Sequence, residues 1–384
     1  MRTFIILFCC ALFGWESQSQ HIEFFKGTWQ EANAKAAMEN KYIFVDAYTE
    51  WCGWCKVMDK KTFTDPAVID FMNEHFVPVK IDFEDSLGIV LGMKFRVWAY
   101  PTSLIFNPQG QLVGKMAGYN DDNADFIKNL QEKLDIKQER VFGFDSKNFD
   151  LPYPEFYASS FMKDNRKWPS DSLVTAYLAN EKDLFSEVNW SVLLRFHPKD
   201  YIDYVIDNRE KYVGIYGNEE VSEIVQYKIY GLMINAAKTS DQALLEQALQ
   251  LCNYIEYPDQ YRFYILMTYY EKTKDWKGYA NALSEYIEKN GYDNAGMIND
   301  HCWRIYENVD DKDILLQTTG WMEKVIVVQP NYFNLDTYAA LLYKTGQYEE
   351  AMKYADQAIE TAKKEGQDYS GTKELKEKIE KAMK

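Results

Sequence analysis

Two cysteines separated by two residues form the most reactive pattern in this chain. Cys52 and Cys55 lie in the segment 51–55, and their spacing allows a small disulfide ring. The apolar run 42–48 favours a strand before them, and 56–61 favours a helix after them. This order places Cys52 at a helix N-terminus, where free N–H groups and the helix dipole favour a thiolate. Because a thiolate attacks disulfides, the segment predicts thiol–disulfide exchange.

Strands and helices are expected to alternate around this motif. The expected strands are 22–25, 42–47, 76–82, 102–106 and 111–116. Two local signals mark helix starts. Thr28 and Glu31 have capping-box spacing, and Asp65-Pro66 supplies an N-cap followed by proline at the first helical position. This order of elements predicts a mixed α/β layer arrangement.

The cysteine motif and the elements around it resemble the thioredoxin family. The resemblance covers about 22–138 and is greatest with exported thioredoxin-like domains that carry W-C-x-W-C-K and then F-x-D-P. Asp46 falls on the family's buried acid, Lys80 on the lysine beside it, and Tyr100-Pro101 on the cis-proline loop. The resemblance therefore implies a thioredoxin fold, in which a mixed sheet is flanked by helices.

The resemblance also implies a role for each of these residues. Cys52 would be the nucleophile and Cys55 the resolving cysteine. Asp46 would accept the proton of Cys55, and Lys80 would tune the charge of Asp46. Burial raises the pKa of a carboxyl group, which suits Asp46 to proton exchange near neutral pH.

A second set of residues is expected to contact the substrate. The set comprises Trp51, Gly53, Trp54, Tyr100 and a cis Pro101. The sequence departs from the family here, because its best-known dipeptide is Gly-Pro where this chain has Gly53-Trp54. Tyr100 is also bulky for the residue before the cis-proline.

Other interpretations of the same residues exist. The CxxC could be half of a zinc site, but there is no second pair and the four histidines are scattered, so no metal is expected. It could also be an inert structural disulfide. Asp46 could be a surface acid, Lys80 a solvated charge on an edge strand, and the two tryptophans core residues.

Composition limits the classes of partner. The chain has 384 residues, which favours two or more domains. Its formal charge is −16, so a nucleic-acid partner is not expected, since phosphate binding needs clustered Lys and Arg.

The N-terminus, 1–19, is typical of a signal peptide. Arg2 supplies a positive charge, 4–13 is apolar, and 17–19 offers small residues for cleavage. The apolar run is shorter than the roughly 20 residues of a membrane-spanning helix, although a retained anchor is an alternative. The sequence thus predicts an exported, periplasmic protein without a stable membrane span after cleavage. A single CxxC with few other thiols then fits a redox-active pair in an oxidising compartment.

The expected domains are a thioredoxin-like domain at 20–140, a linker at 141–154 and an all-α repeat domain at 155–384. The clearest repeats span 224–364. Within them, the second helix of each repeat is expected to begin at Ser240, Trp276, Lys312 and Tyr348, which are spaced 36 residues apart. This part resembles tetratricopeptide repeats, whose period is about 34 residues. An irregular helical bundle is the alternative.

Two further cysteines lie in the repeat domain. Cys252 and Cys302 are expected to be buried free thiols, because cysteine packs as a small hydrophobe. A disulfide between them is the alternative in an oxidising compartment.

Together these features predict an exported thiol–disulfide oxidoreductase that acts on protein disulfides and dithiols through Cys52 and Cys55, as a reductase or isomerase. No flavin or nucleotide signature is present, so no cofactor beyond the redox-active disulfide is expected, and an upstream dithiol protein would donate electrons. The repeats would hold a protein or peptide. Two alternatives are a binding scaffold, in which the thioredoxin-like domain is a platform or redox sensor, and a metal-delivery chaperone.

Overall fold

The computed structural model describes residues 21–134, 146–164 and 166–384. The chain forms two compact units, of which the first ends at Ile224 and the second is Val225–Lys384. The expected signal peptide, 1–19, lies outside the described residues, and so does the segment 141–145 of the expected linker.

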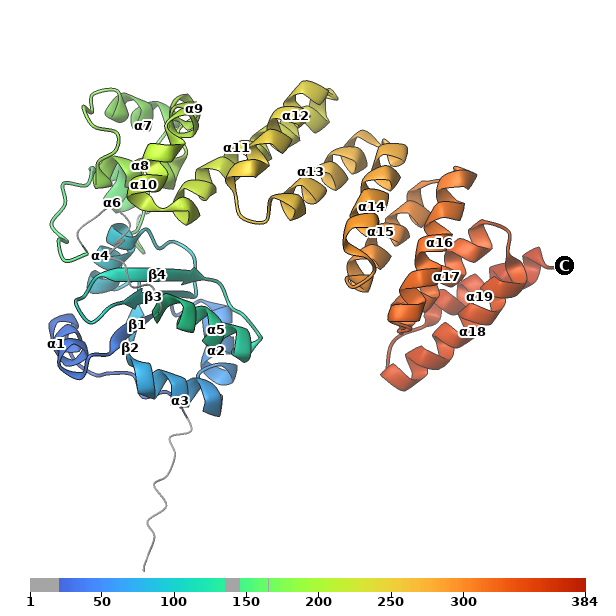
Figure 1. Cartoon of the computed structure of the whole chain (residues 1–384), viewed down its shortest axis with the longest axis horizontal. Helices are drawn as coiled ribbons and strands as arrows, with labels where there is room; N and C mark the ends of the chain where they lie inside the picture. Colours follow the sequence, from blue (N-terminus) through green and yellow to red (C-terminus); the bar gives the residue numbers. More distant parts are fainter. Residues whose placement is uncertain (1–20, 135–145, 165) are drawn as a thin grey trace, which may run out of the picture. The chain divides into compact units, whose positions relative to one another are not determined.

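The first unit begins with an α/β region (Figure 1). Its elements are α1 (Trp29–Glu39), β1 (Tyr42–Tyr48), α2 (Gly53–Lys61), α3 (Pro66–His75), β2 (Phe76–Asp82), α4 (Ser86–Phe95), β3 (Thr102–Phe106), β4 (Leu112–Ala117) and α5 (Asn123–Leu134). The local signals explain two of these starts. Thr28 and Glu31 form the expected capping box of α1, and Asp65 caps α3 with Pro66 at its first position.

The four strands form one mixed sheet with the order β2-β1-β3-β4. β1 pairs with β2 in parallel and with β3 antiparallel, and β3 pairs with β4 antiparallel. The prediction of a strand at 22–25 is wrong. Ile22 donates its N–H to Phe63 and Phe25 donates to Pro78, so the segment bonds to two different partners and forms no ladder.

Successive side chains of β1 pack into two different cores, because successive strand residues point to opposite faces of the sheet. Ile43, Val45 and Ala47 belong to a core that contains residues of α1 and α4. Phe44 belongs to a second core, which contains residues of α2, α3 and α5. Asp46 shares the face of Phe44 and therefore lies on the side of the sheet that α2 covers.

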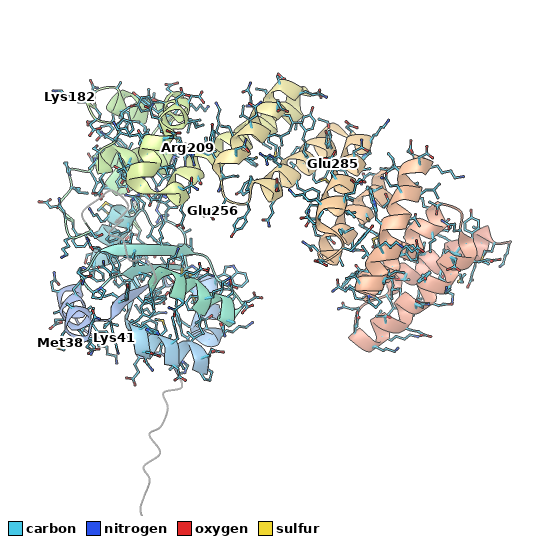
Figure 2. The ribbon with its side chains drawn as sticks, in the orientation of Figure 1. Met38, Lys41, Lys182, Arg209, Glu256 and Glu285 are labelled. Carbon is cyan, nitrogen blue, oxygen red and sulfur yellow. A yellow bond between two sulfur atoms is a disulfide. The ribbon has the colours of Figure 1, made fainter. Side chains whose placement is uncertain are left out.

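The residue that follows the cap of α1 contacts the backbone of α3 through its side chain. Lys41, which follows α1 (Figure 2), donates from Nζ to the carbonyl oxygen of Asn73 at 2.7 Å. Met38 lies on the outer side of α1 and is 79% exposed.

Helices follow the α/β region and complete the first unit. They are α6 (Glu155–Ser159), α7 (Asp171–Leu178), α8 (Glu187–Phe196), α9 (Lys199–Asp207), α10 (Arg209–Tyr216) and the start of α11 (Asn218–Thr239). Tyr157, Trp190 and Tyr212 are buried in the same core as Ile43 and Phe95. The helices from 155 to 224, which the sequence analysis assigned to the repeat domain, thus share a core with the sheet.

The second unit is entirely helical. After the rest of α11 it contains α12 (Gln242–Leu251), a 3-10 turn η1 (Cys252–Tyr254), α13 (Pro258–Thr273), α14 (Trp276–Asn290), α15 (Ala295–Asn308), α16 (Lys312–Val328), α17 (Tyr332–Lys344), α18 (Tyr348–Glu365) and α19 (Ser370–Ala382). Three helices begin at the 36-residue spacing, namely α14, α16 and α18, and α12 begins two residues after Ser240. None of the helices in the described ranges is both long enough and apolar enough to cross a bilayer.

Candidate active site

Cys52 and Cys55 are joined by a disulfide at the N-terminus of α2. Their Cα atoms are 5.3 Å apart. Cys52 is the N-cap of α2, and its Sγ accepts a hydrogen bond of 3.0 Å from the backbone N–H of Cys55. Both residues are only 3% exposed. The strand-to-helix geometry therefore points one helix N–H group, that of Cys55, at the sulfur that would carry the thiolate charge.

The side chains of Asp46 and Lys80 meet on the face of the sheet that α2 covers. They are register partners on β1 and β2, and Lys80 Nζ donates to Asp46 Oδ2 at 2.6 Å. Asp46 is buried, at 1% exposure. Burial raises the pKa of the Asp46 carboxyl group, and the nearby Lys80 ammonium opposes this only in part. Such a carboxyl group holds a proton at a higher pH than an ordinary aspartate does.

Lys80 also contacts an acid that the sequence analysis missed. Its Nζ lies 2.5 Å from Asp59 Oδ1, and Asp59 is half-exposed on α2. Burial alone would lower the pKa of Lys80, but Asp46 and Asp59 outweigh it and raise that pKa. Asp59 lies four residues after Cys55, which places both on one side of α2. The four-residue spacing of Cys55 and Asp59 was the signal for Asp59 that the sequence offered. It does not show that Lys80, on a different strand, would reach the helix that carries both residues.

Trp51 forms one side of the site and is held by a short chain of contacts. Its Nε1 donates to Glu84 Oε1 at 2.9 Å, and Glu84 Oε2 lies 3.3 Å from Lys163 Nζ. Its ring meets that of Tyr100 edge-on at 5.9 Å. The structure thus brings Trp51 and Tyr100 together, and it adds Glu84 and Lys163. The latter lies just after α6, so no motif near the cysteines could have indicated it.

The other side of the site is formed by Trp54, which stacks on Tyr119 with ring centroids 5.4 Å apart. Trp51 and Trp54 are each 61% exposed, so both offer aromatic surface beside the buried sulfurs. A Cβ atom added to Gly53 would meet nothing within 4 Å. The Tyr100–Pro101 peptide bond is cis.

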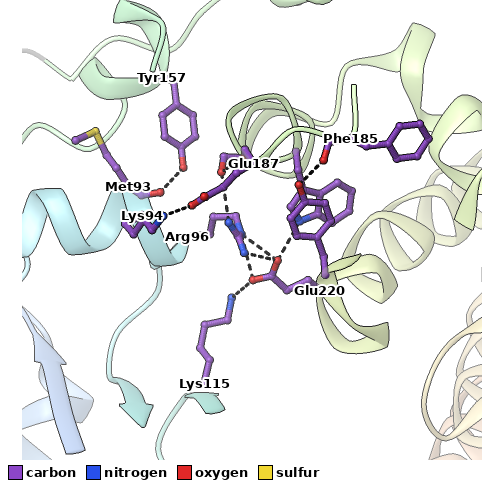
Figure 3. Close-up of polar contacts among 11 residues, drawn as sticks. Met93, Lys94, Arg96, Lys115, Tyr157, Phe185, Glu187 and Glu220 are labelled. Carbon is purple, nitrogen blue, oxygen red and sulfur yellow. Dashed lines mark hydrogen bonds and ion pairs between the residues drawn. The ribbon is translucent and has the colours of Figure 1, made fainter. Parts of the chain in front are cut away.

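The loop that leads to Tyr100 is anchored by residues from the helices that follow the α/β region. The guanidinium of Arg195 lies 5.0 Å from the ring of Trp98, and also packs against Phe161 and Trp168. At the start of the loop, Arg96 is fully buried and binds Glu220 at 2.8 Å (Figure 3). Helices distant in sequence therefore fix the segment 96–100.

Two further thiols of the described residues lie outside the site, in the second unit. Cys252 and Cys302 are free and buried. Burial raises the pKa of Cys252 to about 11 and also raises that of Cys302. Within the described parts of the chain, no group of three or more His, Cys, Asp or Glu is placed to hold a metal ion.

The fold and the site together define a class of protein. A mixed sheet in the order β2-β1-β3-β4, a CxxC disulfide at the start of α2 and a cis-proline before β3 make the N-terminal part of this chain a thioredoxin-like domain.

Comparison with known proteins agrees with this class. Residues 16–90 match the family model Thioredox_DsbH, described as a protein of unknown function, DUF255. An uncharacterized protein of Caenorhabditis elegans is 41% identical over 85 residues, which are 21% of this chain and 12% of that protein. The thiol:disulfide interchange protein DsbD of Pseudoalteromonas atlantica is 29% identical over 100 residues, which are 25% of this chain and 17% of that protein.

The matched region is less than a fifth of the length of each of these relatives. Among solved structures, a putative disulphide-isomerase from Bacteroides thetaiotaomicron is 36% identical and aligns over its whole length with 32% of this chain, at a TM-score of 0.29.

Proposed function

We propose that this chain is an exported thiol–disulfide oxidoreductase that exchanges disulfides with protein substrates through Cys52 and Cys55. The observation that carries the proposal is the position of the pair, since Cys52 caps α2 and its sulfur already accepts a helix N–H. That position lowers the cost of the thiolate that the exchange reaction needs. A family model that matches residues 16–90 includes this pair, and the relatives named as thiol:disulfide interchange proteins match a quarter of the chain.

The proposed reaction transfers two electrons from the Cys52/Cys55 dithiol to a disulfide of the partner. In the reduced chain, the Cys52 thiolate attacks a disulfide of the partner, forms a mixed disulfide and displaces one partner thiolate. Cys55 then loses its proton and attacks the sulfur of Cys52, which releases the second partner thiol and closes the Cys52–Cys55 disulfide. An upstream dithiol protein restores the reduced pair and is itself oxidised, so no other cofactor is required. Isomerisation would differ in the second step, because another thiolate of the partner would attack the partner sulfur of the mixed disulfide, form a new partner disulfide and release Cys52 as a thiolate.

Asp46 is proposed as the acceptor of the Cys55 proton. Its raised pKa suits a carboxyl group that must gain and lose a proton near neutral pH. Lys80 joins buried Asp46 to half-exposed Asp59. The three side chains therefore form a continuous polar path by which the proton could reach solvent.

Substrate contacts are proposed for the exposed aromatic surface around the sulfurs. Trp51 and Trp54 flank the pair, and the ring of Tyr100 meets that of Trp51 edge-on; the proposed contacts also include Gly53 and Pro101. The chain Trp51–Glu84–Lys163 holds one of these rings in place. A partner would thus be recognised by aromatic contacts on both sides of its disulfide.

The second unit is proposed to be tetratricopeptide-like and to hold a protein partner. The support is its succession of helix pairs, three of which have second helices that start at a 36-residue spacing. Export to the periplasm is proposed from the apolar run 4–13 behind Arg2.

A trapping experiment tests the exchange reaction. In the full-length Cys55→Ala variant, a partner attacked by Cys52 cannot be released, so a disulfide-bonded model peptide should form a covalent adduct that survives a non-reducing gel and disappears with dithiothreitol. The matched control is Cys52→Ala, which should give no adduct. Absence of the adduct in Cys55→Ala, or equal adducts in both variants, would refute the proposal.

A further inference from the structure

Arg195, on α8, is a half-buried cation without an acid partner. Among the residues that the structure describes, no carboxylate forms an ion pair with its guanidinium. Two other cations buried in the first unit each have such a partner (Figure 3). Glu187 lies 2.7 Å from Lys94, and Glu220 lies 2.8 Å from Arg96. A charge that is largely removed from water is unfavourable unless it is paired, so Arg195 is a candidate binding site for an anion.

Three aromatic rings and one serine fix the guanidinium of Arg195. Its Cζ lies 5.0 Å from the ring centroid of Trp98, 4.8 Å from that of Phe161 and 5.0 Å from that of Trp168. Its Nε donates to Ser160 Oγ at 3.3 Å, and its Nη2 donates to the Ser160 carbonyl oxygen at 3.1 Å. The ring faces attract the cation, and the hydrogen bonds set the orientation of its planar group.

One nitrogen of this guanidinium is open to a ligand. Arg195 Nη1 donates to none of the described residues, and it is not among the enclosed side-chain atoms that lack a partner. It therefore retains both accessible surface and N–H donors. Burial lowers the pKa of Arg195, and the charge of nearby Arg166, which is exposed, lowers it too. Two neighbouring cations favour an anion that contacts both.

This cationic site lies beside the proposed substrate surface. Trp98, which packs on Arg195, precedes Tyr100 by two residues, and the Tyr100 ring meets that of Trp51. Trp168 packs on the same guanidinium and is 61% exposed. The aromatic surface around the disulfide is thus continued by a cation with an exposed ring next to it.

We propose that Arg195 and Arg166 bind the carboxylate of an aspartate or glutamate side chain on the protein substrate. Arg195 Nη1 would donate to a carboxylate oxygen, Arg166 would add a second positive charge, and Trp168 would pack against the substrate chain. Because the whole chain has a formal charge of −16, these two cations would orient an acidic segment that other surfaces repel. The inference rests on the proposed function, since its ligand is the substrate of the Cys52–Cys55 pair.

The first test compares two disulfide substrates in the trapping assay. Both are acetylated and amidated cystine peptides, which carry either glutamate or glutamine at the second and third positions on each side of the cysteine. The readout is the ratio of their adduct formation rates, glutamate over glutamine, in the full-length Cys55→Ala parent. Adding Arg195→Met, which keeps an apolar stem, should lower this ratio about fivefold, and adding Arg166→Gln should lower it about twofold. Lys182→Gln, which removes the same charge at an exposed position between α7 and α8, should leave the ratio unchanged.

The outcomes separate this inference from the exchange reaction. An equal ratio in the parent and in both arginine variants would overturn the inference, and so would an equal fall in Lys182→Gln. Arg166 is exposed, so its variant tests the site even if Arg195→Met disturbs packing. If Arg195→Met slows both peptides alike and Arg166→Gln leaves the ratio unchanged, the role of Arg195 is structural and the inference fails. No adduct with either peptide in the parent would instead refute the exchange reaction, and the inference with it.

The second test identifies the source of the carboxylate. A glutamine peptide with a free C-terminal carboxylate should react with full-length Cys55→Ala at the same rate as its amidated form. A faster reaction of the free C-terminus, lost in Arg195→Met, would show that the site binds a chain terminus and would overturn the side-chain assignment.

Discussion

The buried ion pair between Arg96 and Glu220 offers a direct test of how the helices up to 224 support the site loop. Arg96 begins the segment that leads to Tyr100, and its side chain has no exposure to solvent. Glu220, on α11, accepts hydrogen bonds from Arg96 Nε at 2.9 Å and from Trp190 Nε1 at 3.0 Å, and Lys115 Nζ lies 3.3 Å away (Figure 3). Glu220→Gln preserves the size of the side chain and removes the charge that these donors share.

The expected loss follows from the burial of both partners. Removing one member of a buried pair leaves the other charge without compensation, which costs about 3–5 kcal/mol in the free energy of unfolding. For a unit of this size that loss lowers Tm by about 6–20 °C. Glu210→Gln, at an exposed position on α10, removes the same charge at the surface and should cost less than about 1 kcal/mol.

Urea denaturation followed by tryptophan fluorescence measures this difference, because Trp190 itself contacts Glu220. The outcome that would refute the reasoning is a loss below about 1 kcal/mol for Glu220→Gln, which is the range of a surface pair. A loss in Glu210→Gln equal to that in Glu220→Gln would refute it too.

The pH dependence supplies a second readout of the same pair. Burial favours a higher pKa for Glu220, but Arg96 and Lys115 outweigh burial and hold that pKa below its usual value. The pair therefore stabilises the fold above the unfolded-state pKa of about 4.3, and this contribution is lost as the pH falls through the lower folded-state pKa. Glu220→Gln should lose less stability than the parent between neutral and acidic pH.

Three further predictions concern the site. Asp46→Asn removes the proposed proton acceptor, so release of a partner from the mixed disulfide should slow by about 10²-fold at pH 7 and recover in part as the pH rises; an unchanged rate and pH profile in stopped-flow measurements would contradict that role. Lys163→Gln removes the ion pair that holds Glu84 against Trp51, so KM for a disulfide peptide should rise several-fold at unchanged kcat; a fall in kcat alone would contradict the positioning role. Equilibration of the Cys52–Cys55 pair with glutathione should give a potential nearer to about −270 mV than to about −120 mV, as for a reductant, and a value at the oxidising end would contradict the proposed direction.

Much of the active-site chemistry was readable from local sequence. The disulfide and its helix N-terminus depend on residues within four positions of one another, and an apolar strand followed by a helix was enough to place them. Asp46 was predicted because it is an acid in an apolar strand at the position of the family's buried acid. The expected strand at 22–25 failed, because a short apolar run does not specify whether a neighbouring strand is free to pair with it.

Tertiary structure decided the contacts that surround this chemistry. The partnership of Asp46 with Lys80 needs the parallel register of β1 and β2, across 34 residues. That of Arg96 with Glu220 spans 124 residues, and no local pattern links them. The sequence by itself determined the position of the cysteine pair at the start of a helix, since helix capping and strand propensity act over a few residues. Only the folded chain could determine which charges and rings enclose it, because burial and pairing depend on which distant segments pack together.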